Sequence, residues 1–234
     1  TLALIASGGH SAWYLVDGDE APTRLCRTRD DAAGETFDKL AQALGLPYPG
    51  GPVVDRLAVD GDPTAVDIPR ARITDAPLDM SFSGLKSAAI REVRRLDLGA
   101  TDEASAGPEV RDLLASFQEA AVEQLLAPAA DLVATHRPRL LTASGGVAAN
   151  SRLRARLRRF GDALGLDELL PPPSLPTDNA AMIARAGQLA MARGDRDDPR
   201  RLDAWTREVW KPPGMRRRRP AGTGTMHRMH TGRA

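Results

Sequence analysis

Apolar residues along this chain follow two different spacings. TLALIA and RPRLLTA contain short continuous apolar runs, each followed within a residue or two by a glycine pair, and they predict buried strands. HSAWYLVDGDE, directly after the first glycine pair, predicts a strand paired with the first, and ELL before the proline-rich loop predicts another short strand. Elsewhere the apolar residues recur every three or four positions, which predicts helices.

The predicted helices fill the middle of the chain. One ends at Gly45, a typical C-terminal capping residue, and another follows the turn YPGG. Further helices are predicted after the Ser/Gly turn of SFSGLK, over 108–136 as one long helix, and from Asn150 onward. The last begins in PTDNAAM, with Thr177 or Asp178 as its N-cap. Strands alternating with helices predict an α/β fold with a helical insertion at about 31–135.

Composition narrows the class of protein. The chain is 42% hydrophobic but only 4% aromatic, which predicts an aliphatic core. Its single cysteine, Cys26, excludes an internal disulfide and a cysteine-based zinc site. No run approaches the ~20 apolar residues that span a bilayer, and no signal peptide opens the chain. We therefore expect a cytoplasmic protein without membrane contact.

The net charge of +1 hides an uneven distribution. Residues 211–234 carry seven Lys and Arg side chains and no acidic one, so residues 1–210 carry −6. A mildly acidic body is not typical of a dedicated nucleic-acid binder. We expect a folded body over 1–210 and a basic, disordered tail over 211–234, for which contact with RNA phosphates and simple solvation are both open.

The letters ASGG occur twice, after the first strand and after the strand near residue 140. A strand that ends in two glycines leaves backbone N–H groups open to close approach by phosphate oxygens. The helix that begins near Asn150 adds the positive end of its dipole. We interpret the two turns as two halves of one phosphate site.

Candidate ligand groups stand near these turns. Asp38 and Asp55 are of the type that binds ribose hydroxyls, although taken alone each is more typical of an exposed helix residue. Asp178 fits a helix N-cap, or a metal ligand that would need His or acidic partners.

Six segments in order resemble the TsaD/Gcp family of tRNA adenosine threonylcarbamoyltransferases. They are ASGGHSAW, DDAAGETFDKLAQALGLPYPGGPVVDRLA, MSFSGLKSA, LLASFQEAAVEQLL, ASGGVAANSRLRARL and PTDNAAMIARAG, and together they cover about residues 1–195. The resemblance implies the actin/Hsp70/sugar-kinase-like (RNase H-like) fold. It also implies transfer of threonylcarbamoyl from threonylcarbamoyl-adenylate to N6 of the adenosine 3′ of the anticodon, in tRNAs that read ANN codons.

The resemblance implies roles for individual residues. One divalent metal, iron or zinc with Fe²⁺ favoured, would be bound by Asp178. The nucleotide would be bound by Ile5, Ala6, Ser7, Gly8, Gly9, Asp38, Gly51, Asp55 and Asn150. No residue is implied as a catalytic acid, base or nucleophile.

The chain also departs from the family pattern. The family's first lobe carries an HxxxH metal motif, and no HxxxH occurs in this sequence. We therefore expect the second lobe of an enzyme, partial by itself, with a scaffold homologue and a small ATPase as implied partners. A non-catalytic scaffold of the same pathway and an O-carbamoyltransferase of the same superfamily are the alternatives.

Overall fold

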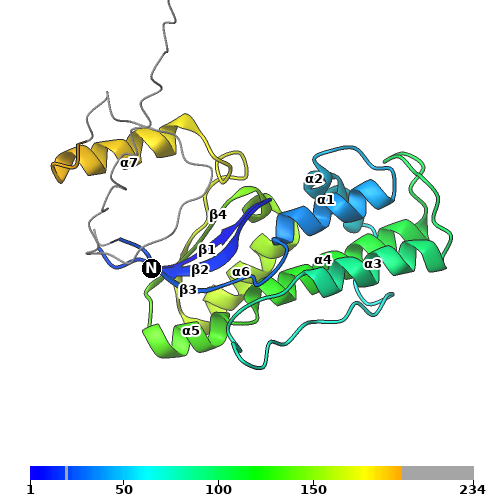
Figure 1. The fold of residues 1–234 in the computed structure, drawn as a ribbon, viewed down its shortest axis with the longest axis horizontal. Helices are drawn as coiled ribbons and strands as arrows, with labels where there is room; N and C mark the ends of the chain where they lie inside the picture. Colours follow the sequence, from blue (N-terminus) through cyan, green and yellow to red (C-terminus); the bar gives the residue numbers. More distant parts are fainter. Residues whose placement is uncertain (19–20, 197–234) are drawn as a thin grey trace, which may run out of the picture. The chain divides into compact units, whose positions relative to one another are not determined.

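A computed structural model describes residues 1–18 and 21–196, and these contain one mixed sheet with helices (Figure 1). The strands are β1 (Leu2–Ala6), β2 (Ser11–Leu15), β3 (Thr23–Arg27), β4 (Leu140–Ser144) and β5 (Asp167–Leu169). Their order is β3-β2-β1-β4-β5; β2 is antiparallel to both neighbours, whereas β1, β4 and β5 run parallel. The predicted α/β class is confirmed, and this order is that of an RNase H-like lobe.

The central strand β1 is apolar because four of its five residues are buried. Leu2, Leu4 and Ala6 are fully buried, and Trp13 of β2 is buried beside them, with its indole N–H donating to the Leu125 carbonyl at 2.9 Å. The strand β3 was not predicted. It is an edge strand in which only Cys26 is buried, so its sequence TRLCR carries no apolar run.

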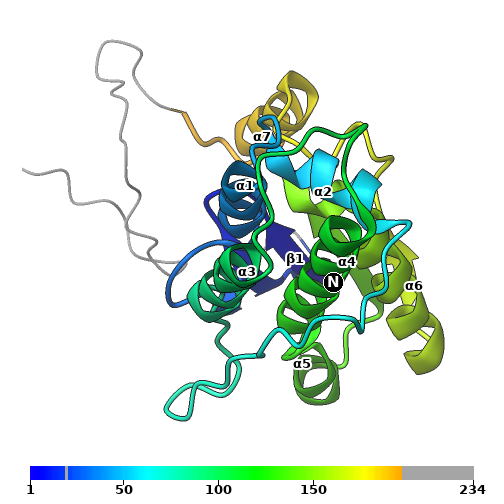
Figure 2. The same ribbon diagram turned by 90° about the vertical axis from the view of Figure 1, so that its right-hand side faces the viewer.

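Five helices lie between β3 and β4: α1 (Ala33–Ala43), α2 (Gly50–Ala58), α3 (Ser83–Arg95), α4 (Pro108–Leu126) and α5 (Ala129–His136). Figure 2 shows α1 to α4 gathered around one another. Their apolar faces form one core, in which the Phe37 and Phe117 rings meet edge-to-face at 5.2 Å. A second core lies between the sheet, the end of α4, α5 and α6 (Ser151–Leu164).

Two local predictions were wrong. The single helix predicted over 108–136 is divided into α4 and α5 around Pro128, because proline lacks the N–H that a continuous helix requires. The last helix, α7 (Ala180–Ala192), is capped by Asn179, whose side chain accepts from the Met182 amide at 3.1 Å. Neither Thr177 nor Asp178 is the N-cap.

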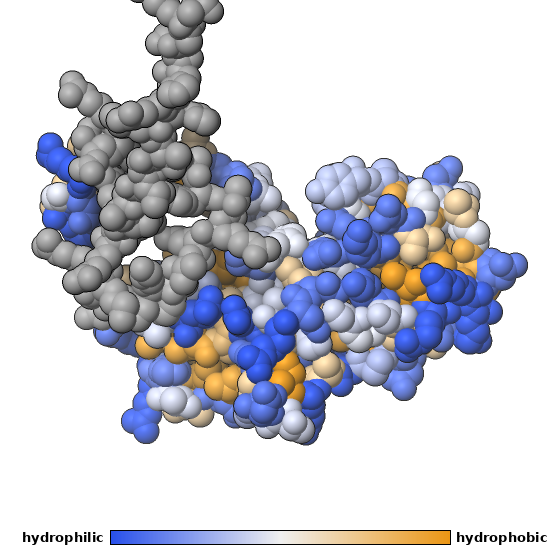
Figure 3. Space-filling view, viewed as in Figure 1, coloured by the Kyte–Doolittle hydropathy of each residue, from blue (hydrophilic) through white to orange (hydrophobic). Residues whose placement is uncertain are grey.

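The predicted basic tail over 211–234 and the end of the predicted body lie outside the described residues. Within the described part, no helix is long and apolar enough to cross a membrane. On the face drawn in Figure 3, charged and polar residues separate the apolar patches into small areas.

Candidate functional site

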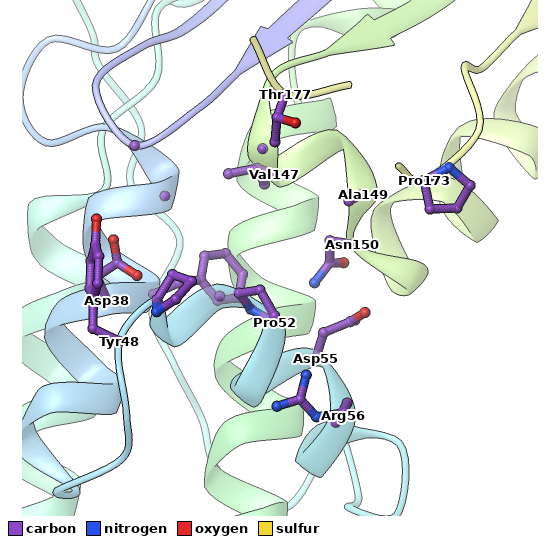
Figure 4. A pocket seen from close by; sticks show the side chains of 16 residues that line it. Asp38, Tyr48, Pro52, Asp55, Arg56, Val147, Ala149, Asn150, Pro173 and Thr177 are labelled. Atoms are coloured by element: carbon purple, nitrogen blue, oxygen red, sulfur yellow. The ribbon is translucent and has the colours of Figure 1, made fainter. Parts of the chain in front are cut away.

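A pocket of about 530 Å³ lies where β1 and β4 end, and this volume is typical of a small-molecule site. Its wall brings together segments from distant parts of the chain: the two glycine turns, α1, the loop before α2, α2 itself and the proline-rich loop. The lining residues are Gly8, Gly34, Phe37, Asp38, Tyr48, Pro49, Gly51, Pro52, Asp55, Arg56, Gly146, Val147, Ala149, Asn150, Pro173 and Thr177. In Figure 4, Asp38 and Tyr48 lie on one side and Asp55, Arg56 and Asn150 on the other.

The two glycine turns are neighbours because β1 and β4 are paired in parallel, with Ile5 opposite Ser144. Gly145 has a φ of 95°, and a Cβ atom added to it would lie 2.2 Å from the Ala6 carbonyl oxygen. Gly34 of α1 also fits closely, since its added Cβ would lie 2.6 Å from the Ser7 carbonyl oxygen. Glycine at these positions therefore lets three segments meet at one edge of the pocket.

Some amides of the glycine turns are already hydrogen-bonded. The Gly9 and His10 amides donate to the Ser7 hydroxyl at 3.3 and 3.1 Å, and the Gly145 amide donates to the Pro176 carbonyl at 2.7 Å.

The remaining amides lie at the pocket. Among the described residues, the amides of Gly8, Gly146 and Val147 have no hydrogen-bond acceptor, and all three residues line the pocket. Gly146 also begins a short 3₁₀ helix, η1 (Gly146–Ala149). Open N–H groups from two neighbouring turns are suited to bind the oxygens of a phosphate or an oxyanion.

Asp38 connects α1 to the start of α2. Its Oδ1 accepts from the Gly50 amide at 2.8 Å, and Gly50 fits against α1 so closely that an added Cβ would lie 2.4 Å from the Ala41 Cβ. Asp38 Oδ2 has no partner among the described residues and is half-buried at the pocket. Gly51 faces open space, since an added Cβ would meet nothing within 4 Å.

Asp55 is engaged at the start of α6. Its two carboxylate oxygens accept from the Ser151 amide at 3.1 and 3.0 Å, and the Ser151 hydroxyl donates to it at 2.8 Å. Asp55 therefore joins α2 to α6 across the pocket wall. Asn150, directly before α6, is its N-cap and accepts from the Leu153 amide at 2.9 Å.

The SFSGLK segment is hydrogen-bonded to the loop before α1. Asp30 accepts from the Phe82 amide at 2.8 Å, and Asp31 accepts from the Ser83 hydroxyl at 2.8 Å. Lys86 forms an ion pair with Asp31, and this contact lowers the pKa of the Asp31 carboxyl below its usual value. Since α1 starts two residues after Asp31, these contacts fix where α1 begins.

Comparison with known proteins assigns the chain to a family. A model of the TsaD family, described as tRNA N6-adenosine threonylcarbamoyltransferase, matches residues 1–185. The chain belongs to this family.

Three curated relatives with that same name show the extent of the match. The protein of Anaeromyxobacter dehalogenans (strain 2CP-1) is 47% identical over 199 residues, which are 85% of this chain and 58% of the relative. The proteins of Geobacter metallireducens and Bacillus cereus are 44% and 45% identical, covering 84% and 83% of this chain and 56% and 55% of theirs. The chain thus spans little more than half the length of these relatives.

Among solved structures, the activator of the 2-hydroxyisocaproyl-CoA dehydratase from Clostridium difficile overlays with a TM-score of 0.48 at 12% identity. The overlay covers 87% of this chain and 65% of that one, and it is too loose to assign a function.

The structure gathers most, but not all, of the substrate residues that resemblance to the TsaD family implied. Gly8, Asp38, Gly51, Asp55 and Asn150 line one pocket. Ile5 and Ala6 belong to β1, and Ser7 and Gly9 belong to the first turn; none of these four is among the lining residues.

Sequence reasoning missed several lining residues. Tyr48 is 84% exposed, and Gly34, Arg56 and Thr177 also line the pocket. Tyr48 is the first residue of the YPGG turn that contains Gly51, and Arg56 follows in the helix after that turn, so nearness to this motif was the available signal.

Asp178 is exposed and follows the lining residue Thr177. The described part of the chain contains no group of three His, Cys, Asp or Glu side chains that could hold a metal ion. Asp178 alone does not complete a divalent site, which requires several ligands. A role for it in metal binding stays a prediction.

Proposed function

We propose that this chain supplies the nucleotide-binding wall of a tRNA N6-adenosine threonylcarbamoyltransferase. In that reaction threonylcarbamoyl passes from threonylcarbamoyl-adenylate to N6 of the adenosine 3′ of the anticodon, in tRNAs that read ANN codons. The observation that carries the proposal is the set of open amides at Gly8, Gly146 and Val147, from two neighbouring turns at one pocket. A family member with such a pocket is suited to an adenylate.

Parts of the pocket are suited to the phosphate and the ribose of an acyl-adenylate. The open amides would bind the phosphate, and Asp38 Oδ2, which has no partner among the described residues, would accept from a ribose hydroxyl. The Gly51 surface leaves room for the sugar to approach α2. Since the acyl group is already activated, orientation of the adenylate and stabilisation of charge are the main requirements, and no side-chain nucleophile is needed.

The finer parts of the proposal concern the metal, the partners and the location. Asp178 would be one ligand of a divalent metal, with Fe²⁺ favoured over zinc, and its other ligands would come from outside the described residues. No step of the transfer is assigned to that metal. We further propose a scaffold homologue and a small ATPase as partners, and action in the cytoplasm, where tRNA is the substrate.

Titration calorimetry with AMP tests the phosphate site directly. AMP shares the adenosine and phosphate of the acyl-adenylate, so saturable binding, tighter than that of adenosine, is expected. Gly51→Ala places a methyl group in the space facing the pocket and is expected to weaken AMP binding about tenfold. Gly84→Ala is the matched control, because its added Cβ also meets nothing within 4 Å but Gly84 belongs to α3, outside the pocket lining.

Different outcomes would contradict different parts of the proposal. Absence of saturable AMP binding, or equal affinity for AMP and adenosine, would contradict the proposed phosphate site. Equal AMP affinity in the Gly51→Ala and Gly84→Ala variants would contradict the placement of the nucleotide beside α2.

A further inference from the structure

A buried glutamine lies behind the pocket wall. Gln118, in the middle of α4, is only 5% exposed and does not line the pocket. Its side-chain oxygen accepts a hydrogen bond from Asn150 Nδ2 at 2.8 Å. A side-chain amide in such surroundings is costly to bury without a partner, and the partner here is a residue of the pocket.

The contact fixes the orientation of the Asn150 amide. Asn150 Oδ1 accepts from the Leu153 amide at 2.9 Å, while Nδ2 donates to Gln118. A flip of the amide would set Nδ2 against the Leu153 N–H and Oδ1 against the Gln118 oxygen, so both contacts would become repulsive. The two hydrogen bonds together therefore permit one orientation of the amide at the pocket.

Glu119, the residue after Gln118 in α4, also contacts α6. Glu119 is 8% exposed and forms ion pairs with Arg152 and Arg156, both in α6. Gln118 and Glu119 thus join α4 to the first two turns of α6 through one amide contact and one pair of charged contacts. The charged pair holds the helix, whereas only the amide contact reaches a pocket residue.

We propose that Gln118 is a positioning residue for the nucleotide: it acts through Asn150, holding that amide in the orientation that the bound ligand meets. The inference rests on the proposed function, since it takes the pocket to be a nucleotide site. At metal sites, removal of a residue that orients a ligating side chain through a hydrogen bond typically costs about 10–100-fold in affinity or activity.

The test compares two glutamines of the same helix. Gln118→Met keeps the size of the side chain and removes the acceptor. Gln124→Met is the matched control, because Gln124 is 4% exposed and its side-chain amide is also hydrogen-bonded, to the Ala71 backbone at 3.0 and 3.1 Å, away from the pocket. Gln118→Glu keeps an acceptor for Asn150 Nδ2 and serves as the conservative variant.

Each variant is titrated with AMP, and its unfolding in urea is measured in parallel. We expect Gln118→Met to weaken AMP binding roughly tenfold, Gln124→Met to stay within about twofold despite a similar loss of stability, and Gln118→Glu to recover most of the affinity at pH 8. Unchanged affinity in Gln118→Met would overturn the inference, as would an equal loss in Gln118→Met and Gln124→Met. If the unaltered chain does not bind AMP, the proposed function fails first, and that result is distinguishable from either of these.

Discussion

In the second glycine turn, substitution of two adjacent glycines by alanine is expected to have very different effects on stability. Gly145 has φ 95° and ψ 162°, a combination that is essentially restricted to glycine. An alanine Cβ at this position would lie 2.2 Å from the Ala6 carbonyl oxygen and 2.7 Å from its carbon. Both are backbone atoms of the central strand, so the clash is relieved only if β1 and the turn move apart.

The magnitude follows from two contributions. The unfavourable backbone conformation costs about 1–3 kcal/mol, and forcing a methyl group into a packed site costs about 1–3 kcal/mol more. Gly145→Ala should therefore lower the free energy of unfolding by about 4 kcal/mol, a large share of the ~5–15 kcal/mol typical of a domain. In Gly146→Ala the added Cβ meets only the Thr177 Cγ2, at 3.8 Å, so the change should stay within about 0.5 kcal/mol.

Urea unfolding of both variants, followed by far-ultraviolet circular dichroism, measures the difference. The expected result is a large shift of the midpoint for Gly145→Ala and almost none for Gly146→Ala, with similar slopes. A difference of less than about 1 kcal/mol between the free energies of unfolding of the two variants would refute this reasoning. Close packing between the two glycine turns would then not be the reason for glycine at position 145.

Three further outcomes are expected. Burial raises the pKa of the Cys26 thiol to about 11, so at pH 8 a thiol reagent should modify it ~100-fold more slowly in the folded chain than in urea. The hydrogen bond from Lys86 lowers the pKa of Asp31, so its contribution to stability is present above the ordinary value of ~3.9 and is lost as the pH falls through the lower folded value. Asp31→Asn should accordingly reduce the urea midpoint at pH 7 but much less at pH 3. Tyr48→Ala should weaken AMP binding several-fold whereas Tyr48→Phe should not, because an exposed ring at the pocket is suited to stack on a base; equal binding by both would remove that role.

The fold was predictable where the local pattern and the tertiary environment agree. The strand β1 is an apolar run because four of its five residues are buried, and β4 alternates buried Leu141 and Ala143 with half-buried neighbours. The helix α1 shows helical spacing because one face packs into the core. The pattern failed at two places, for different reasons. The edge strand β3 buries only Cys26, and the break at Pro128 separates two helices whose apolar residues continue the same spacing.

The candidate site was predictable only as a set of motifs. The glycine turns, Asp38, Gly51 and Asp55 could be selected because each is a residue type suited to a nucleotide. The sequence did not reveal that both oxygens of Asp55 are engaged by Ser151, or that Gln118 lies behind Asn150. Those contacts join residues 96 and 32 positions apart.

Local chemistry alone therefore determined which residues of this chain can face a phosphate or a sugar: glycine leaves amides accessible, and carboxylates accept from hydroxyls. Only the tertiary structure decided which of those groups remain available. Parallel pairing of β1 with β4 brings the two turns to one edge of the sheet, and the packing of α2, α4 and α6 engages some amides and oxygens while leaving others open. Hydrogen-bonding capacity is a property of each residue, but whether it is already used depends on neighbours that are distant in the chain.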